Sequence, residues 1–241
     1  MSRQIYRVTP ADLVGSAWRS LVADSGQTHY WSHDWSPAWY RKLALAGFIS
    51  TAVEYSDPPF LLLPELQTDY AVLDWANLVV DRGSKKFLSG PVDECPRLTT
   101  STRLEPLLDA IAAYHQRSWL CPEYRRVLLQ LAADPQPEFQ VLSVELRSAE
   151  GQLVAGEVGY VAGATYTSLT GFFDRADRRW NNAGKFQLVL WAQHLRDAGY
   201  AFWNLGHPYM KYKLDLGAKV LPRQAFLVRW EDAIGRQPLK A

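Results

Sequence analysis

The sequence predicts an α/β protein with a mixed central sheet, because strand-like and helix-like segments alternate along most of its 241 residues. Hydrophobic residues make up 48% of the chain, with ten Trp and twelve Tyr, so a large core can form. Two prolines within residues 134–137 can neither extend a helix nor join a β-ladder. We therefore expect a smaller N-terminal α/β domain over residues 1–134 and a second domain over residues 138–241.

The N-terminal domain has one clearly marked helix. Ser36 is a typical N-cap residue, Pro37 follows it in the first turn, and Gly47 provides a stop. The other elements expected here are strands over residues 51–55, 59–63 and 70–74 and helices over residues 104–117 and 122–132.

The second domain has a more regular pattern that contains a β-hairpin. Gly163 and Ala164 predict a two-residue turn, and counting back along the hairpin places Glu157 opposite Thr170. The elements expected here are strands over residues 139–146, 153–162, 165–173 and 200–204, a polar loop over residues 174–182 and a helix over residues 183–198.

Composition excludes several classes of protein. With 26 basic and 25 acidic residues, the chain does not hold nucleic acid by bulk charge, although a local basic patch is compatible with this balance. Its two cysteines are too few for a disulfide scaffold and have no spacing typical of a metal site. No signal peptide or membrane-spanning run is visible, so we expect a cytoplasmic protein without a membrane partner.

Seven short motifs follow one another in an order that resembles the leucyl/phenylalanyl-tRNA protein transferase family, and the likeness extends over residues 34–227. The motifs are Asp34-Trp-Ser-Pro-Ala38, Asp81-Arg-Gly-Ser-Lys-Lys-Phe87, Trp119-Leu-Cys-Pro-Glu123, Ser143-Val-Glu-Leu146, Leu153-Val-Ala-Gly-Glu-Val-Gly159, Asn182-Ala-Gly-Lys185 and Leu216-Gly-Ala218.

The resemblance implies a small N-terminal domain followed by a domain with the N-acetyltransferase-like (GNAT-like) fold. Proteins of that family move an amino acid from the 3′ end of a charged tRNA to the N-terminus of an acceptor protein. The chain is thus similar to an aminoacyltransferase that needs no cofactor beyond aminoacyl-tRNA as its co-substrate.

The chain departs from the family pattern in the motifs that the resemblance links to catalysis. Where the family carries Asp-Cys-Gln after the last core strand, this chain has Asn204-Leu205-Gly206, and its strand around residues 168–172 contains no acid. Glu157 stands where the family has an apolar residue. These changes favour a different amino acid or acceptor, either a protein N-terminus or a small-molecule amine.

Four side chains are candidates for catalysis. Glu157, with Thr170 across the hairpin, binds an α-amino group or accepts a proton in one interpretation, and is an exposed strand glutamate in the other. His207, just after a strand end, either relays a proton or belongs to a surface loop. Asn204 either polarises a carbonyl or ties down the strand end.

Two further sets are candidates for binding. Cations and backbone N–H groups before the helix at residues 183–198 are typical of a phosphate site, and aromatic side chains can line an acyl pocket or stack on an adenosine. The substrate-binding candidates are Tyr166, Phe172, Trp180, Asn182, Lys185 and Trp203, and the tRNA-binding candidates are Arg82, Lys85, Lys86, Arg179, Lys211 and Lys213.

Two other functions remain open at this point. An acyl-CoA-dependent N-acyltransferase shares the expected fold, and a non-catalytic binding protein can keep the fold without the reaction. The sequence leaves the oligomeric state undetermined.

Overall fold

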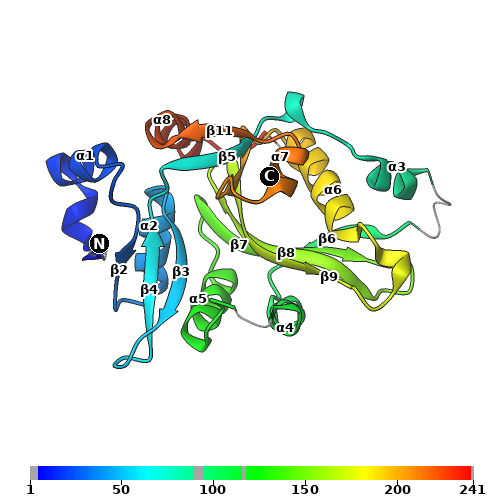
Figure 1. Ribbon diagram of the computed structural model, residues 1–241, viewed down its shortest axis with the longest axis horizontal. Coiled ribbons are helices and arrows are strands. Elements are labelled where there is room, and N and C mark those ends of the chain that lie inside the picture. The colour runs from blue at the N-terminus through cyan, green and yellow to red at the C-terminus, as the bar shows by residue number, and fades with distance from the viewer. Residues whose placement is uncertain (1–4, 90–94, 116–117, 240–241) are drawn as a thin grey trace.

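A seven-stranded mixed sheet forms the centre of the molecule in a computed structural model, which describes residues 5–89, 95–115 and 118–239 (Figure 1). The strand order is β11-β5-β10-β9-β8-β7-β6, and the α/β architecture expected from the sequence is confirmed. The strands are β5 (Asp69–Leu73), β6 (Arg97–Ser101), β7 (Phe139–Arg147), β8 (Leu153–Ala162), β9 (Thr165–Phe173), β10 (Phe202–Gly206) and β11 (Lys219–Pro222).

The hairpin between β8 and β9 begins as predicted and then changes register. Ala162 pairs with Thr165 across the turn. A β-bulge then inserts one extra residue into β9, so Glu157 lies opposite Gly171. The predicted pairing of Glu157 with Thr170 is therefore wrong by one residue, because a count along an ideal ladder does not allow for a bulge.

Helices cover both faces of the sheet (Figure 1). α4 (Glu105–Tyr114) and α5 (Pro122–Ala133) pack on one face, and α6 (Ala183–Asp197) packs on the other. All three helices were expected from apolar spacing, although the predicted end of α4 at Arg117 lies outside the described residues. α8 (Arg223–Ile234) adds its buried face to the core shared with α4 and α5.

The N-terminal part of the chain packs against one side of this sheet (Figure 1). Its predicted helix is confirmed as α2 (Pro37–Leu45), and the Ser36 hydroxyl accepts a hydrogen bond from the Trp39 N–H as an N-cap does. The other elements of this part are β1 (Tyr6–Arg7), η1 (Pro10–Leu13), α1 (Gly15–Ala23), β2 (Tyr30–Trp31), β3 (Ile49–Glu54) and β4 (Phe60–Glu65), whereas η2 (Trp75–Asn77) follows β5 and contacts α6.

The central sheet is continuous across the double-proline segment. β5 and β6 precede residue 134, yet β5 pairs with β10 and β11, and β6 pairs with β7. The domain boundary placed at residues 134–137 stays a prediction, and the site described below is built from both sides of it. No helix in the described part of the chain is long and apolar enough to cross a bilayer.

Arg223 joins the N-terminal segment to the sheet. Its side chain is 3% exposed, and its guanidinium donates to five backbone carbonyls that come from two separate segments. A buried cation of this kind is stabilised by the carbonyl dipoles around it. The accepting carbonyls belong to Leu21, Asp24, Gln27, Leu66 and Gln67.

Replacing this guanidinium tests how much its hydrogen bonds contribute to the free energy of unfolding. Arg223→Met should lower the free energy of unfolding by about 3–5 kcal/mol, because it leaves several buried carbonyls without donors. The control variant Arg236→Met removes an exposed arginine that is paired with Asp232, and should change the free energy of unfolding by less than about 1 kcal/mol. Urea denaturation of both variants measures the difference, and equal midpoints would contradict a structural role for Arg223.

Candidate functional site

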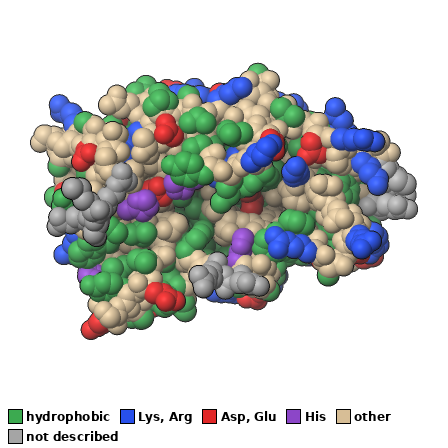
Figure 2. All heavy atoms as spheres, viewed as in Figure 1, with side chains coloured by type: hydrophobic (Ala, Val, Ile, Leu, Met, Phe, Trp, Pro, Cys, Tyr) green, Lys and Arg blue, Asp and Glu red, His purple; other side chains and the backbone are tan. Residues whose placement is uncertain are grey.

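β9 and β10 separate near the middle of the sheet and leave one edge of β9 without a strand partner over part of its length, while its other edge stays paired with β8. The two strands run parallel but pair only over Thr165–Thr167 and Phe202–Asn204. On its other side β10 pairs with β5, from Trp203 to Gly206 with an irregularity after Asn204, and the strand ends at Gly206, whose φ of +72° favours glycine. The rest of β9, from Ser168 onward, has no pairing with β10, and Figure 2 shows that this face of the molecule is hollowed near its centre.

Glu157 lies beneath this separation, on β8. Its side chain is 5% exposed, and Ser168 Oγ donates to the carboxyl at 3.1 and 3.2 Å from its two oxygens. Ser168 is held in turn by the Trp203 indole N–H at 2.9 Å. Burial raises the pKa of Glu157 to about 7, while the Ser168 and Tyr166 hydroxyls and the charge of Lys213 oppose that shift. The carboxyl therefore changes its protonation state near neutral pH.

Lys213 is a buried residue of α7 (Lys211–Asp215) that interacts electrostatically with Glu157. We expected it to contact phosphate at the surface, but its side chain is 6% exposed and Nζ donates to the His207 carbonyl at 2.8 Å. Burial lowers the pKa of Lys213 to about 8, and the charge of Glu157 acts in the opposite direction. The hollow thus has an acid and a base beneath it that both titrate within about one unit of neutral pH.

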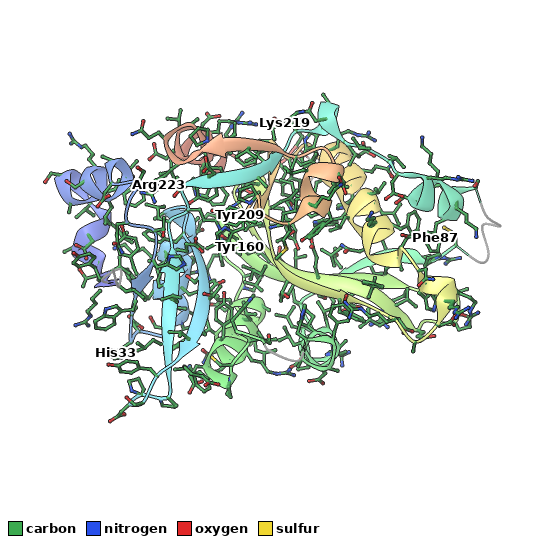
Figure 3. The ribbon with its side chains drawn as sticks, in the orientation of Figure 1. His33, Phe87, Tyr160, Tyr209, Lys219 and Arg223 are labelled. Carbon is green, nitrogen blue, oxygen red and sulfur yellow. The ribbon has the colours of Figure 1, made fainter. Side chains whose placement is uncertain are left out.

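His207 directly follows β10, accepts from Lys213 through its backbone carbonyl, and lies next to an acid that the sequence did not indicate. Its Nε2 is 2.8 Å from Oε2 of Glu65, at the end of β4, and its ring stacks on Tyr209 at 5.1 Å between centroids. His29 Nε2 lies 3.8 Å from the same carboxyl oxygen. Tyr209 is labelled near the centre of the view in Figure 3.

The interactions of Asn204 and Thr170 lie within the sheet itself. The Asn204 amide donates to Thr167 Oγ1 at 3.3 Å, and its Oδ1 accepts from the Gly206 N–H at 2.9 Å. Both ends of this buried amide are engaged within the strand end, which agrees with the interpretation that it ties β10 down. Thr170 is half-buried and pairs with Val158.

The predicted aromatic residues divide into core and accessible groups. Tyr166 and Trp203 are completely buried and pack edge to face, and Trp180 belongs to a core cluster beneath α6. Phe172 alone among the four predicted aromatic candidates is half-buried, near Tyr114 at the end of α4.

The end of α4 also supplies residues that the sequence did not indicate. His115 Nε2 is 3.0 Å from the carbonyl of Gly171, in the part of β9 that does not pair with β10. The guanidinium of Arg175 lies 4.0 Å from the ring centroid of Tyr114. In the sequence, only their positions just after a helix and just after a strand could have indicated His115 and Arg175.

The two basic segments come together at one end of the molecule. α3 (Arg82–Leu88) packs on α6, with the Phe87 and Phe186 rings stacked at 4.8 Å. Asn182, with a φ of +74°, takes a left-handed conformation beside Gly83. This packing brings Arg82, Lys85 and Lys86 to the same end as Arg179 and Lys185, where Figure 2 shows basic side chains grouped.

Two of the predicted tRNA-binding residues are paired with carboxylates of the protein. Arg179 is on this basic end but is bonded to Asp177 at 2.8 Å. Lys211 is exposed on α7 and paired with Asp215 at 2.6 Å. With Lys213 buried, α7 contributes little free positive charge to the surface.

Residues 79–214 match the model of the acetyltransferase (GNAT) domain family, which is more than half of the chain. The chain belongs to this family. It is also 38% identical, over 93 residues, to a leucyl/phenylalanyl-tRNA–protein transferase from Pseudomonas paraeruginosa. That match covers 37% of this chain and 38% of the relative, so the chain aligns with well under half of that protein.

Solved structures with a related arrangement have low sequence identity to this GNAT domain protein. The C-terminal domain of a putative lysylphosphatidylglycerol synthetase from Agrobacterium fabrum has a TM-score of 0.46 and 16% identity, covering 86% of this chain and 68% of that one. A GCN5-related N-acetyltransferase from Kribbella flavida has a TM-score of 0.40 and 13% identity, covering 86% and 70%.

The raised pKa of Glu157 makes stability depend on pH. Between about pH 4.5 and 7 the folded protein holds a proton that the unfolded chain has lost, so the free energy of unfolding should fall as pH rises through this range. The loss amounts to at most roughly 3.5 kcal/mol. Urea denaturation from pH 4.5 to 7 should show this slope in the wild type and a shallower one in Glu157→Gln, whereas parallel curves would contradict the shifted pKa.

Proposed function

We propose that this protein forms an amide bond by transferring an amino acid from aminoacyl-tRNA to the amine of a protein or small-molecule acceptor. The observation that carries the proposal is the buried carboxyl of Glu157 beneath the separation of β9 from β10. The similarity to a leucyl/phenylalanyl-tRNA–protein transferase and the acetyltransferase family model both support acyl transfer.

Glu157 is suited to binding the α-amino group of the amino acid. In its ionised form the carboxylate attracts an ammonium group, and the nearby cation of Lys213 favours that form. A free α-amino group distinguishes an aminoacyl ester from the acyl group of an ordinary acyl-CoA. This interaction therefore favours charged tRNA as the donor.

The unpaired part of β9 is suited to binding the acyl group itself. From Ser168 to Phe173 the strand lacks β10 as a neighbour, so peptide N–H groups on that edge can donate to a carbonyl oxygen. An ester is already activated, and positioning together with carbonyl polarisation lowers the barrier without a covalent enzyme intermediate.

The basic end and the stacked pair at α4 are suited to the tRNA. α3 and the start of α6 present Arg82, Lys85, Lys86 and Lys185, which can neutralise phosphates. The exposed guanidinium of Arg175 over Tyr114 offers a planar surface on which a base can stack. Both groups lie toward the Phe173 end of β9, away from His207.

A donor comparison tests the assigned role of Glu157. With aminoacyl-tRNA, Glu157→Gln should lower kcat/KM by roughly 10–100-fold, because a charge-assisted hydrogen bond is removed. With the matching N-acetylaminoacyl-tRNA, wild type and variant should react equally slowly. Glu150→Gln, an exposed glutamate in the β7–β8 turn, is the control and should behave as wild type.

The outcomes separate the rival functions. Transfer from acetyl-CoA with no transfer from total charged tRNA would replace this proposal with an acyl-CoA-dependent activity. Absence of transfer from both donors would favour a non-catalytic binding protein. An equal loss with both tRNA donors would give Glu157 the role of proton acceptor instead.

Salt dependence tests the basic end. Alanine at Arg82, Lys85 and Lys86 together should weaken tRNA binding and reduce the slope of log affinity against log salt by about 2–3, at about 0.7–0.9 for each phosphate that the protein no longer neutralises. The matched control removes three exposed arginines on other elements and should leave the slope unchanged. Filter binding at several salt concentrations measures both, and the control set is Arg19, Arg126 and Arg236.

A further inference from the structure

His207 is held by three separate interactions at the end of β10. Its Nε2 is 2.8 Å from Glu65 Oε2, its ring stacks on Tyr209, and its backbone carbonyl accepts from Lys213 Nζ at 2.8 Å. The side chain nevertheless remains 38% exposed. A histidine fixed in this way and still open to solvent can meet a substrate in one defined orientation.

Glu65 is a dedicated partner and not a surface carboxylate that His207 meets by chance. It is 8% exposed and lies at the end of β4, 142 positions away in the sequence. The other groups around this carboxylate are His29, whose Nε2 at 3.8 Å is beyond hydrogen-bond distance, and the buried hydroxyl of Tyr70, which interacts with it electrostatically. Only His207 is bonded to the Glu65 carboxylate by a side chain at normal hydrogen-bond distance among the described residues.

This arrangement determines which nitrogen of His207 can take a proton. An ionised carboxylate only accepts hydrogen bonds, so Glu65 selects the neutral imidazole that carries its proton on Nε2. The lone pair then lies on Nδ1. We infer that Glu65 is a positioning residue that holds His207 with Nδ1 as the proton acceptor for the attacking amine.

The inference deepens the proposed function and rests on it. The amine nitrogen forms a bond to the ester carbonyl carbon, and its proton passes to Nδ1 of His207. The carbon–oxygen bond of the ester then breaks, and the imidazolium returns the proton to the leaving ribose oxygen. No net proton is gained or lost, and His207 ends the step in the neutral form in which it began.

The first test compares two conservative variants in the full-length protein. Glu65→Gln should lower kcat by roughly 100-fold or more with KM for aminoacyl-tRNA nearly unchanged, because the amide no longer selects one tautomer. His29→Gln, which changes the other histidine beside the same carboxylate, should keep the wild-type kcat. A kcat for Glu65→Gln equal to that of the wild type would overturn the inference.

A second measurement does not depend on activity. In protein labelled with ¹⁵N-histidine, long-range proton–nitrogen spectra should show neutral His207 with its proton on Nε2, and Glu65→Gln should show a mixture of both tautomers. A proton on Nδ1 in the wild type would overturn the inference even if Glu65→Gln proved unstable. If the wild type transfers nothing while the Nε2 tautomer is observed, the proposed function fails and the geometry of the pair stands.

Discussion

The separation of β10 from β9 is the constraint on which the candidate site depends. Two parallel strands that remained paired would satisfy each other's peptide groups and leave no opening in the sheet. β10 pairs with β9 only as far as Asn204 and ends at Gly206, in its left-handed conformation, so the edge of β9 that faces away from β8 has no β10 partner from Ser168 onward. The bulge in β9 falls at the same level and sets which β9 residue lies across the ladder from Glu157.

Desolvation then decides the chemistry of the groups beneath this opening. A carboxyl and an ammonium in water would hold opposite full charges at neutral pH, far from their own titration ranges. Burial destabilises the charged form of each, which moves the pKa of Glu157 up and that of Lys213 down. Each also limits the shift of the other, so both groups titrate near neutral pH.

Local signals in the sequence were sufficient for much of the fold. The cap and stop residues of α2 and the turn at Gly163 act over a few residues, and the structure follows them. The bulge in β9 has no such signal, because it depends on how three strands pack together. The short edge strands β6 and β11 were also missed, since neither forms a run that stands out before it pairs.

The candidate site shows the same limit more sharply. The positions of Glu157 on a predicted strand and of His207 just after one made them candidates. The residues that bind them, Ser168 and Glu65, were identified only from the structure. Glu65 is 142 positions from His207, and Lys213 was interpreted as a surface cation because α7 was not foreseen. Charge and residue type indicate that a side chain can do chemistry, whereas burial and long-range interactions decide its role.

The layout of β9 relates the two ends of the proposed donor. Its Phe173 end packs beside Trp180 and Phe186 at the basic end, and its Ser168 end lies beside Glu157. Because of the bulge, the stretch from Ser168 to Phe173 lies opposite Gly159 to Ala155 of β8, which span about 13 Å. A donor that binds both ends must therefore carry its phosphates well away from its reactive carbonyl. The single-stranded end of a charged tRNA has that length and also a free α-amino group for Glu157, and the N-acetylated donor removes only the second feature.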